Sequence, residues 1–347
     1  MAEGQAGSRK SKPAHEANET DASAPAESTA GGPGGRTAGA PAGSTAGSPG
    51  ESTAGGPGEP TAGAPAESTA SVPAESDGGA GGDVGILFVG DVVGGIGRRT
   101  LLASLPLLRE RYAPTFTVVN AENVAGGLGI TPKIADELLA SGVDAITLGN
   151  HAYHRREIYP YLDSEPRIVR PANFLRTQPG RGVCVVQHDG VRLGVVNLSG
   201  NLYLRAGRSA FTEIEVALSE VGDADQVLVD MHAEATSEKV AMGWYLDGRV
   251  TAVVGTHTHV PTADARVLDE GTAYITDVGM TGPRGGVIGV KREQALEGLV
   301  TQMPVRFETS EVDPWLMGVF IRCSGPRRAA SIEQILMRRP SPNSREK

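Results

Sequence analysis

The chain has 347 residues and a formal net charge of −9, and its composition separates two parts. Residues 1–82 hold 18 Gly and 9 Pro, and Met1 and Val72 are their only larger aliphatic residues. Such a segment cannot bury enough apolar surface to offset the entropy of ordering, so we expect a disordered arm. The arm carries 4 Lys and Arg against 10 Asp and Glu, which leaves the remainder nearly neutral and excludes a strongly basic nucleic-acid binder.

The arm contains an eight-residue repeat, in which prolines recur from Pro25 to Pro73. A period of eight matches neither a helix nor a strand, and octapeptides such as residues 25–32 have no apolar side chains to stack, which argues against a solenoid. We expect a solvated linker or tail, and a role as the ligand of a partner is the alternative.

Cysteine usage and hydropathy favour a soluble cytoplasmic protein. Cys184 and Cys323 lie far apart and neither belongs to a Cys-x-x-Cys pair, so a disulfide scaffold and a thiolate zinc site are not expected. The basic residues near the N-terminus are not followed by the apolar core of a secretory signal, and no later stretch reaches the ~18 apolar residues of a membrane span.

From Gly85 onward, short apolar runs alternate with segments of helical periodicity, and we expect a folded domain over residues 83–336 with a flexible tail over 337–347. Strands are predicted at residues 85–90, 116–120, 144–148, 183–187, 193–198, 226–231, 250–255 and 273–278. Helices are predicted at residues 98–111, 132–140, 155–162, 211–221, 237–246 and 292–300.

This alternation is typical of an α/β domain with a largely parallel sheet. Two stretches depart from it: residues 183–198 read as a hairpin that turns at Asp189-Gly190, and residues 316–323 and 329–335 read as an antiparallel pair. A sandwich of two mixed sheets therefore fits better than a single Rossmann sheet.

Metal-competent side chains follow five of the predicted strands. The carboxyl ends of such strands converge at the edge where α/β sheets bind ligands. Each residue alone has a simpler explanation, since Asp91 could cap a helix and His232 could be a hydrogen-bonded polar residue. The combination of carboxylates, amides and imidazoles without a thiolate suits Mn, Fe or Zn. The candidates are Asp91, Glu122, Asn123, Asn150, His151, His232, His257 and His259.

The segment Thr256-His257-Thr258-His259 is the most informative single motif, because residues i and i+2 of an extended segment project to the same side. Two rival motifs are weak. His232-Ala-Glu234 matches half of a zinc deaminase signature, but the Pro-Cys-x-x-Cys half is absent. The glycine-rich residues 94–97 and 126–129 match neither the dinucleotide-binding nor the Walker pattern.

The order of these motifs resembles that of the calcineurin-like metallophosphoesterases, and longer blocks are similar to the YmdB-like branch, in which Asn-x-Glu-Asn replaces Gly-Asp-x-x-Asp. The resemblance covers residues 85–336. It rests on Gly90-Asp91, Asn120-Ala-Glu-Asn123, Gly149-Asn-His151, Arg170-Pro-Ala-Asn173, Met231-His232, Met242-Gly-Trp-Tyr245, Gly255-Thr-His-Thr-His259 and Thr276-Asp-Val-Gly279.

The resemblance implies a four-layer α/β/β/α sandwich and a site for two metal ions, with iron or manganese the expected metals. By this resemblance Glu122 bridges the metals, Asp91, Asn123 and His259 complete one site, and Asn150, His232 and His257 complete the other. It further implies a phosphodiesterase acting on 2′,3′-cyclic nucleotides, in which a metal-bound hydroxide attacks phosphorus and His151 is the general acid.

The chain departs from the family pattern in two places. The superfamily's Asp-x-His is here Asp91-Val92-Val93, which removes one imidazole and leaves an oxygen-richer first site, with Asn123 as its replacement ligand. The branch's Asn-His-Thr-Trp-Asp has Tyr153 and His154 at its last two places, so the acid that would orient His151 is not identified.

The resulting hypothesis is a cytoplasmic enzyme with a small nucleotide-type phosphoester substrate. We expect no stable nucleic-acid complex and no membrane partner, and the sequence leaves open whether the chain forms a homo-oligomer. Two alternatives remain. The chain could be a phosphatase for another phosphoester, or a metal- or nucleotide-dependent regulatory protein with little turnover.

Overall fold

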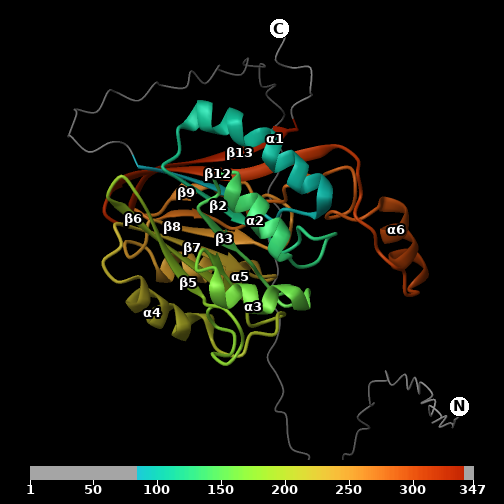
Figure 1. Ribbon diagram of the computed structural model, residues 1–347, viewed down its shortest axis with the longest axis horizontal. Coiled ribbons are helices and arrows are strands. Elements are labelled where there is room, and N and C mark those ends of the chain that lie inside the picture. The colour runs from blue at the N-terminus through green and yellow to red at the C-terminus, as the bar shows by residue number, and fades with distance from the viewer. Residues whose placement is uncertain (1–83, 340–347) are drawn as a thin grey trace, which may run out of the picture. The chain divides into compact units, whose positions relative to one another are not determined.

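The computed structural model describes residues 84–339 (Figure 1). The predicted arm over residues 1–82 and residues 340–347 of the predicted tail lie outside the described residues. To cross a bilayer, a helix would have to be longer and more apolar than any found within residues 84–339.

The first sheet is mixed and follows the order β11-β12-β1-β2-β3-β4, with β13 paired to β12. Its parallel part, β1 to β4, is extended on the β1 side by the long antiparallel strand β12. The strands are β1 (Gly85–Val89), β2 (Phe116–Asn120), β3 (Ala145–Thr147), β4 (Ile168–Val169), β11 (Gly282–Pro283), β12 (Pro314–Gly325) and β13 (Arg328–Arg338).

The second sheet, of order β5-β6-β7-β8-β10-β9, is also mixed. Its first two strands form the predicted hairpin, in which Asp189 and Gly190 both adopt positive φ angles of 48° and 83°. Asp-Gly is a preferred pair for such a turn because both central residues need left-handed backbone. The strands are β5 (Val183–His188), β6 (Val191–Ser199), β7 (Gln226–His232), β8 (Ala252–Thr256), β9 (Arg266–Val267) and β10 (Ala273–Ile275).

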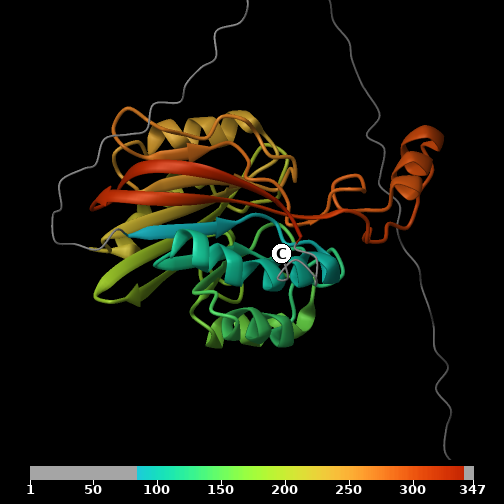
Figure 2. The ribbon, with the colours of Figure 1, turned by 90° about the horizontal axis from the view of Figure 1, so that it is seen from above.

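Helices cover the outer face of each sheet (Figure 2). Helices α1 to α3 lie on the first sheet, and α4 and α5 lie on the second, whereas α6 stands away from the sandwich. A short 3₁₀ turn at Arg156–Ile158 precedes α3. The helices are α1 (Gly94–Tyr112), α2 (Pro132–Ala140), α3 (Tyr159–Ser164), α4 (Ala210–Val221), α5 (Thr236–Tyr245) and α6 (Arg292–Thr301).

Three apolar clusters hold these layers together. Strand β1 shows how, because its alternate residues point to opposite faces: Leu87 packs with the α1 and α2 side chains, and Phe88 packs toward the second sheet. The third cluster lies between the second sheet and α4 and α5, where Ile214 and Met242 are buried. Both sheets are thus covered on two faces, which confirms the four-layer α/β/β/α sandwich.

The element boundaries differ from the prediction mainly at glycines and at very short strands. Helix α1 begins at Gly94, four residues before the predicted start at Arg98, where the apolar spacing begins. Glycine is a poor helix former, so the glycine-rich first turn gives no local helix signal. Gly97 is needed for packing, since a Cβ at this position would lie 2.4 Å from the carbonyl oxygen of Thr281. The two-residue strands β4, β9 and β11 were not predicted, and β13 extends to Arg338, two residues past the expected end of the domain.

Candidate metal centre

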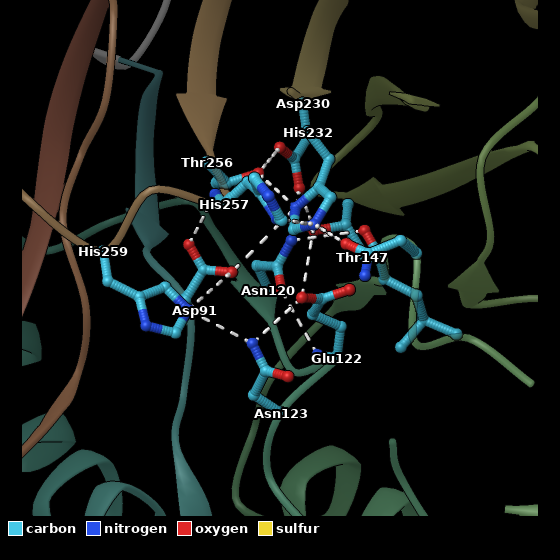
Figure 3. A network of polar contacts seen from close by, with 12 residues as sticks. Asp91, Asn120, Glu122, Asn123, Thr147, Asp230, His232, Thr256, His257 and His259 are labelled. Atoms are coloured by element: carbon cyan, nitrogen blue, oxygen red, sulfur yellow. Dashed lines mark hydrogen bonds and ion pairs between the residues drawn. The ribbon is translucent and has the colours of Figure 1, made fainter. Parts of the chain in front are cut away.

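All eight candidate side chains meet at one edge of the sandwich, where strands of both sheets end. The ends of β1, β2 and β3 in the first sheet supply five of them, and β7 and β8 in the second sheet supply the other three, which are His232, His257 and His259. Figure 3 shows most of this group as one connected polar network. The two sheets therefore contribute opposite halves of a single site.

Glu122 lies at the middle of this network and is fully buried. Its Oε1 atom is 3.2 Å from Nε2 of His232 and accepts a hydrogen bond from Nδ2 of Asn123 at 2.9 Å. Burial alone would raise the pKa of Glu122, but the neighbouring His232 and His151 hold this pKa well below its ordinary value. The ionised Glu122 carboxylate thus contacts His232 on one side and Asn123 on the other.

On one side of Glu122 lie Asn150, His232 and His257. Nε2 of His232 lies 3.0 Å from Oδ1 of Asn150 and 3.1 Å from Nδ1 of His257. Donor atoms of Glu122, His232 and His257 all lie within 4.8 Å of one another, which is the spacing of ligands around a metal ion. Burial, and then the charge of His232, lowers the pKa of His257 to about 3, so its imidazole is neutral and able to bind a cation.

On the other side lie Asp91, Asn123 and His259. Nε2 of His259 is 4.0 Å from Oδ1 of Asp91 and 3.2 Å from Nδ2 of Asn123. Asn123 fits the predicted ligand role less directly than the others, because its amide oxygen faces His151 and its nitrogen faces Glu122 and His259. To bind a cation there, the amide has to present its oxygen instead.

The His257–His259 segment reaches the cluster through left-handed backbone and not as an extended strand, which corrects the geometry predicted from sequence. Strand β8 ends at Thr256, and His257 and His259 have φ angles of 96° and 66°. Such backbone is costly for non-glycine residues and persists only where the surroundings hold it. As a result, His257 points to His232 and His259 points toward Asp91, on the two sides of Glu122.

A buried ion pair holds this strained segment. Nζ of Lys239, on α5, lies 2.7 Å from Oδ2 of Asp277, and both side chains are almost completely buried. The same oxygen accepts hydrogen bonds from the backbone N–H and the hydroxyl of Thr258, at 3.2 and 2.7 Å. Thr258 separates the two histidines, so this carboxylate fixes the segment between them.

A second buried carboxylate, Asp230, connects the two sheets behind the site. It accepts hydrogen bonds from Nδ2 of Asn120, from the hydroxyl of Thr147 and, at 2.6 Å, from the hydroxyl of Thr256. The Thr256 hydroxyl in turn lies 2.9 Å from Nδ1 of His232 and orients that ring. Burial raises the pKa of Asp230 to about 6.

Packing requires a glycine at position 149, directly before Asn150 and His151. A Cβ at this position would lie 2.3 Å from both Oε2 of Glu122 and Nε2 of His232, which is closer than any real contact. Only a residue without a side chain lets these two groups approach each other here.

His151 lies beside the cluster, with its side chain about a quarter exposed. Its Nδ1 is 2.8 Å from Oδ1 of Asn123, and its backbone N–H donates to Oε2 of Glu122. Because an amide oxygen only accepts, Nδ1 carries a proton in this contact. His154 is exposed and its ring centroid lies 5.8 Å from that of His151.

The donor set fits a cation-binding site. Asp91 is fully buried, and its Oδ1 atom has no hydrogen-bond partner within residues 84–339. A buried carboxylate oxygen without a partner is costly unless a cation satisfies it. Burial raises the pKa of Asp91, with the nearby His259 and His232 opposing the rise.

Comparisons with known proteins show which family the chain resembles. The model of the family described as "YmdB-like protein" matches residues 87–335. A Bacillus subtilis protein named 2′,3′-cyclic-nucleotide 2′-phosphodiesterase is 47% identical over 254 residues, which cover 73% of this chain and 96% of that protein. A Mycoplasma genitalium protein named putative phosphatase/phosphodiesterase is 37% identical over 262 residues, covering 73% of this chain and 92% of its own length.

Two solved structures have the same fold. The crystal structure of a hypothetical protein from Thermus thermophilus superposes with a TM-score of 0.70 at 38% identity, covering 74% of this chain and all of that one. That of a novel phosphatase from Mycoplasma pneumoniae gives 0.69 at 34% identity, covering 75% of this chain and 95% of that one. The chain therefore belongs to the YmdB-like family.

Proposed function

We propose that the protein is a cytoplasmic, metal-dependent phosphodiesterase that hydrolyses 2′,3′-cyclic nucleotides. The observation that carries this proposal is the position of Glu122, whose Oε1 atom contacts one group of ligand-type side chains through His232 and the other through Asn123. The name of the Bacillus subtilis relative supports the choice of substrate.

Two metal ions, of iron or manganese, would occupy the two sides of Glu122. Asp91, Asn123 and His259 would hold one, and Asn150, His232 and His257 would hold the other. When bound, the metals supply Lewis acidity at phosphorus and lower the pKa of coordinated water. Oxygen and imidazole ligands without thiolate suit these ions.

His151 is the proposed general acid. Its Nδ1 lies 3.3 Å from Oε1 of Glu122, a contact that does not depend on the orientation of the Asn123 amide, so Nε2 is the atom that can deliver a proton to the leaving ribose oxygen. In the same site Lys239 and Asp277 keep His257 and His259 in place.

Metal binding should release a proton from His232. Burial alone would lower the pKa of His232, but the charge of Glu122 and that of Asp91 raise it to about 9 in the metal-free protein. A bound metal requires the neutral ring, so the apparent affinity should increase with pH until about pH 9 and then level off. Calorimetric titration of Mn²⁺ at pH 7, in buffers of different ionisation enthalpy, should show about one proton released per chain. A pH-independent affinity without proton release would contradict this role of His232.

The activity itself distinguishes the proposal from its two alternatives. Protein purified without chelator should contain about two metals per chain and hydrolyse both 2′,3′-cyclic AMP and bis-p-nitrophenyl phosphate. Faster hydrolysis of p-nitrophenyl phosphate than of either diester would favour a phosphatase. Tight nucleotide binding without turnover would favour a regulatory protein and exclude the enzyme.

A further inference from the structure

A cavity of about 620 Å³ lies over the candidate metal centre. Its floor includes Glu122, Asn123, His151, His257 and His259. This volume is typical of a pocket for a small organic ligand and exceeds what a phosphate group alone needs. The rest of the cavity must therefore face a part of the ligand other than the phosphate.

The opposite wall of the cavity comes from the long connection between β11 and β12, which includes α6. Nδ1 of His259 lies 2.8 Å from the carbonyl oxygen of Ile288, which joins this connection to the candidate metal centre. The side chains that this connection contributes to the lining are apolar except for one hydroxyl, that of Thr309, and none of them is charged. The apolar ones, called here the apolar wall, are Val287, Ile288, Val290, Ala295, Leu299 and Phe307.

Much of the apolar wall faces solvent. Ile288, Leu299 and Phe307 are 55%, 67% and 56% exposed. Apolar side chains gathered around a polar site in this way are typical of a ligand-binding surface. The apolar wall and the candidate metal-ligand residues line the same cavity. This indicates that the wall and the metal centre bind different parts of one molecule.

We propose that the apolar wall binds the base of a nucleotide whose phosphodiester lies at the candidate metal centre, with the Phe307 ring as the stacking surface. This inference rests on the proposed phosphodiesterase function. Every base presents a flat π face, and a wall without charged groups offers little hydrogen-bond discrimination. The enzyme should accordingly accept all four bases with similar KM values.

The test is Phe307→Ala, assayed with two substrates that share the reacting group. One is 2′,3′-cyclic AMP, and the other is methyl riboside 2′,3′-cyclic phosphate, which has no base. Loss of a stacking contact should raise KM for the cyclic nucleotide by about tenfold, with kcat nearly unchanged, and leave the base-free substrate unaffected. Phe307→Tyr, which keeps the ring, should restore the original KM.

Val300→Ala is the matched control, because Val300 is a highly exposed apolar residue of α6 that does not line the cavity. Phe307 is half exposed, so its truncation leaves the folded core intact. Equal losses on both substrates, or no change on either, would overturn the inference while leaving the proposed function standing. If Phe307→Ala instead dissociates an oligomer in sedimentation velocity without changing KM, the apolar wall faces a second copy and the inference is wrong. If the unmodified protein hydrolyses neither substrate, the proposed function fails first and the inference falls with it.

Discussion

Glu122→Gln is expected to lower the metal content from about two ions per chain and to reduce kcat/KM by on the order of 10²-fold or more. The substitution keeps the size of the side chain but removes the charge that lies between the two ligand groups. A glutamine at this position also brings an N–H toward Nε2 of His232 or Nδ2 of Asn123, where only an acceptor fits. Metal analysis and steady-state kinetics on the same preparation measure both effects.

Glu234→Gln is the matched control for this experiment. Glu234 is half exposed and its Oε2 lies 3.1 Å from Nε2 of His257, so it touches the cluster from the solvent side without being a proposed ligand. Its change should leave the metal content at two and alter kcat/KM far less. If Glu122→Gln keeps both metals and full activity, Glu122 does not bridge them.

Much of the architecture could be predicted from the sequence because its buried strands are continuous apolar runs. Residues Phe116–Asn120 and Pro132–Ala140 were predicted to the residue, since a β-branched run and a Thr-Pro start are strong local signals. The Asp-Gly turn likewise fixed the β5–β6 hairpin. The start of α1 at Gly94 depends on a tertiary approach to Thr281, which no local pattern records.

The candidate site residues were predicted to lie together because they follow strand ends. The buried side chains that hold them in place were not predicted. Asp230 sits inside a buried apolar strand and Lys239 on a helix, and only the fold brings them to Thr256 and Asp277. A charged residue within the run Gln226–His232 was the available signal for Asp230. The apolar wall was not predicted as a binding surface. Ala295 and Leu299 lie on α6, whose periodicity indicated only a helix, and the other four residues lie on irregular parts of the connection.

His151→Ala is expected to leave both metals bound while slowing hydrolysis of substrates with poor leaving groups by about 10²–10⁴-fold. The ring touches Asn123 and Glu122 from the edge of the cluster, so its removal takes away no proposed ligand. A ribose alkoxide needs a proton as it departs, whereas p-nitrophenolate barely does. The loss on bis-p-nitrophenyl phosphate should therefore be much smaller than the loss on 2′,3′-cyclic AMP.

The difference between these two substrates is the signature of acid catalysis, and His154→Ala provides the comparison. His154 is exposed beside His151 and is the next histidine able to supply a proton. If His151 is the acid, His154→Ala should change neither substrate's rate by more than about twofold. If His151→Ala loses one metal, or slows both substrates equally, His151 acts as a ligand or in substrate positioning. A leaving-group effect in His154→Ala alone would move the acid to that residue, because only the group that protonates the departing oxygen makes the rate depend on the basicity of that oxygen.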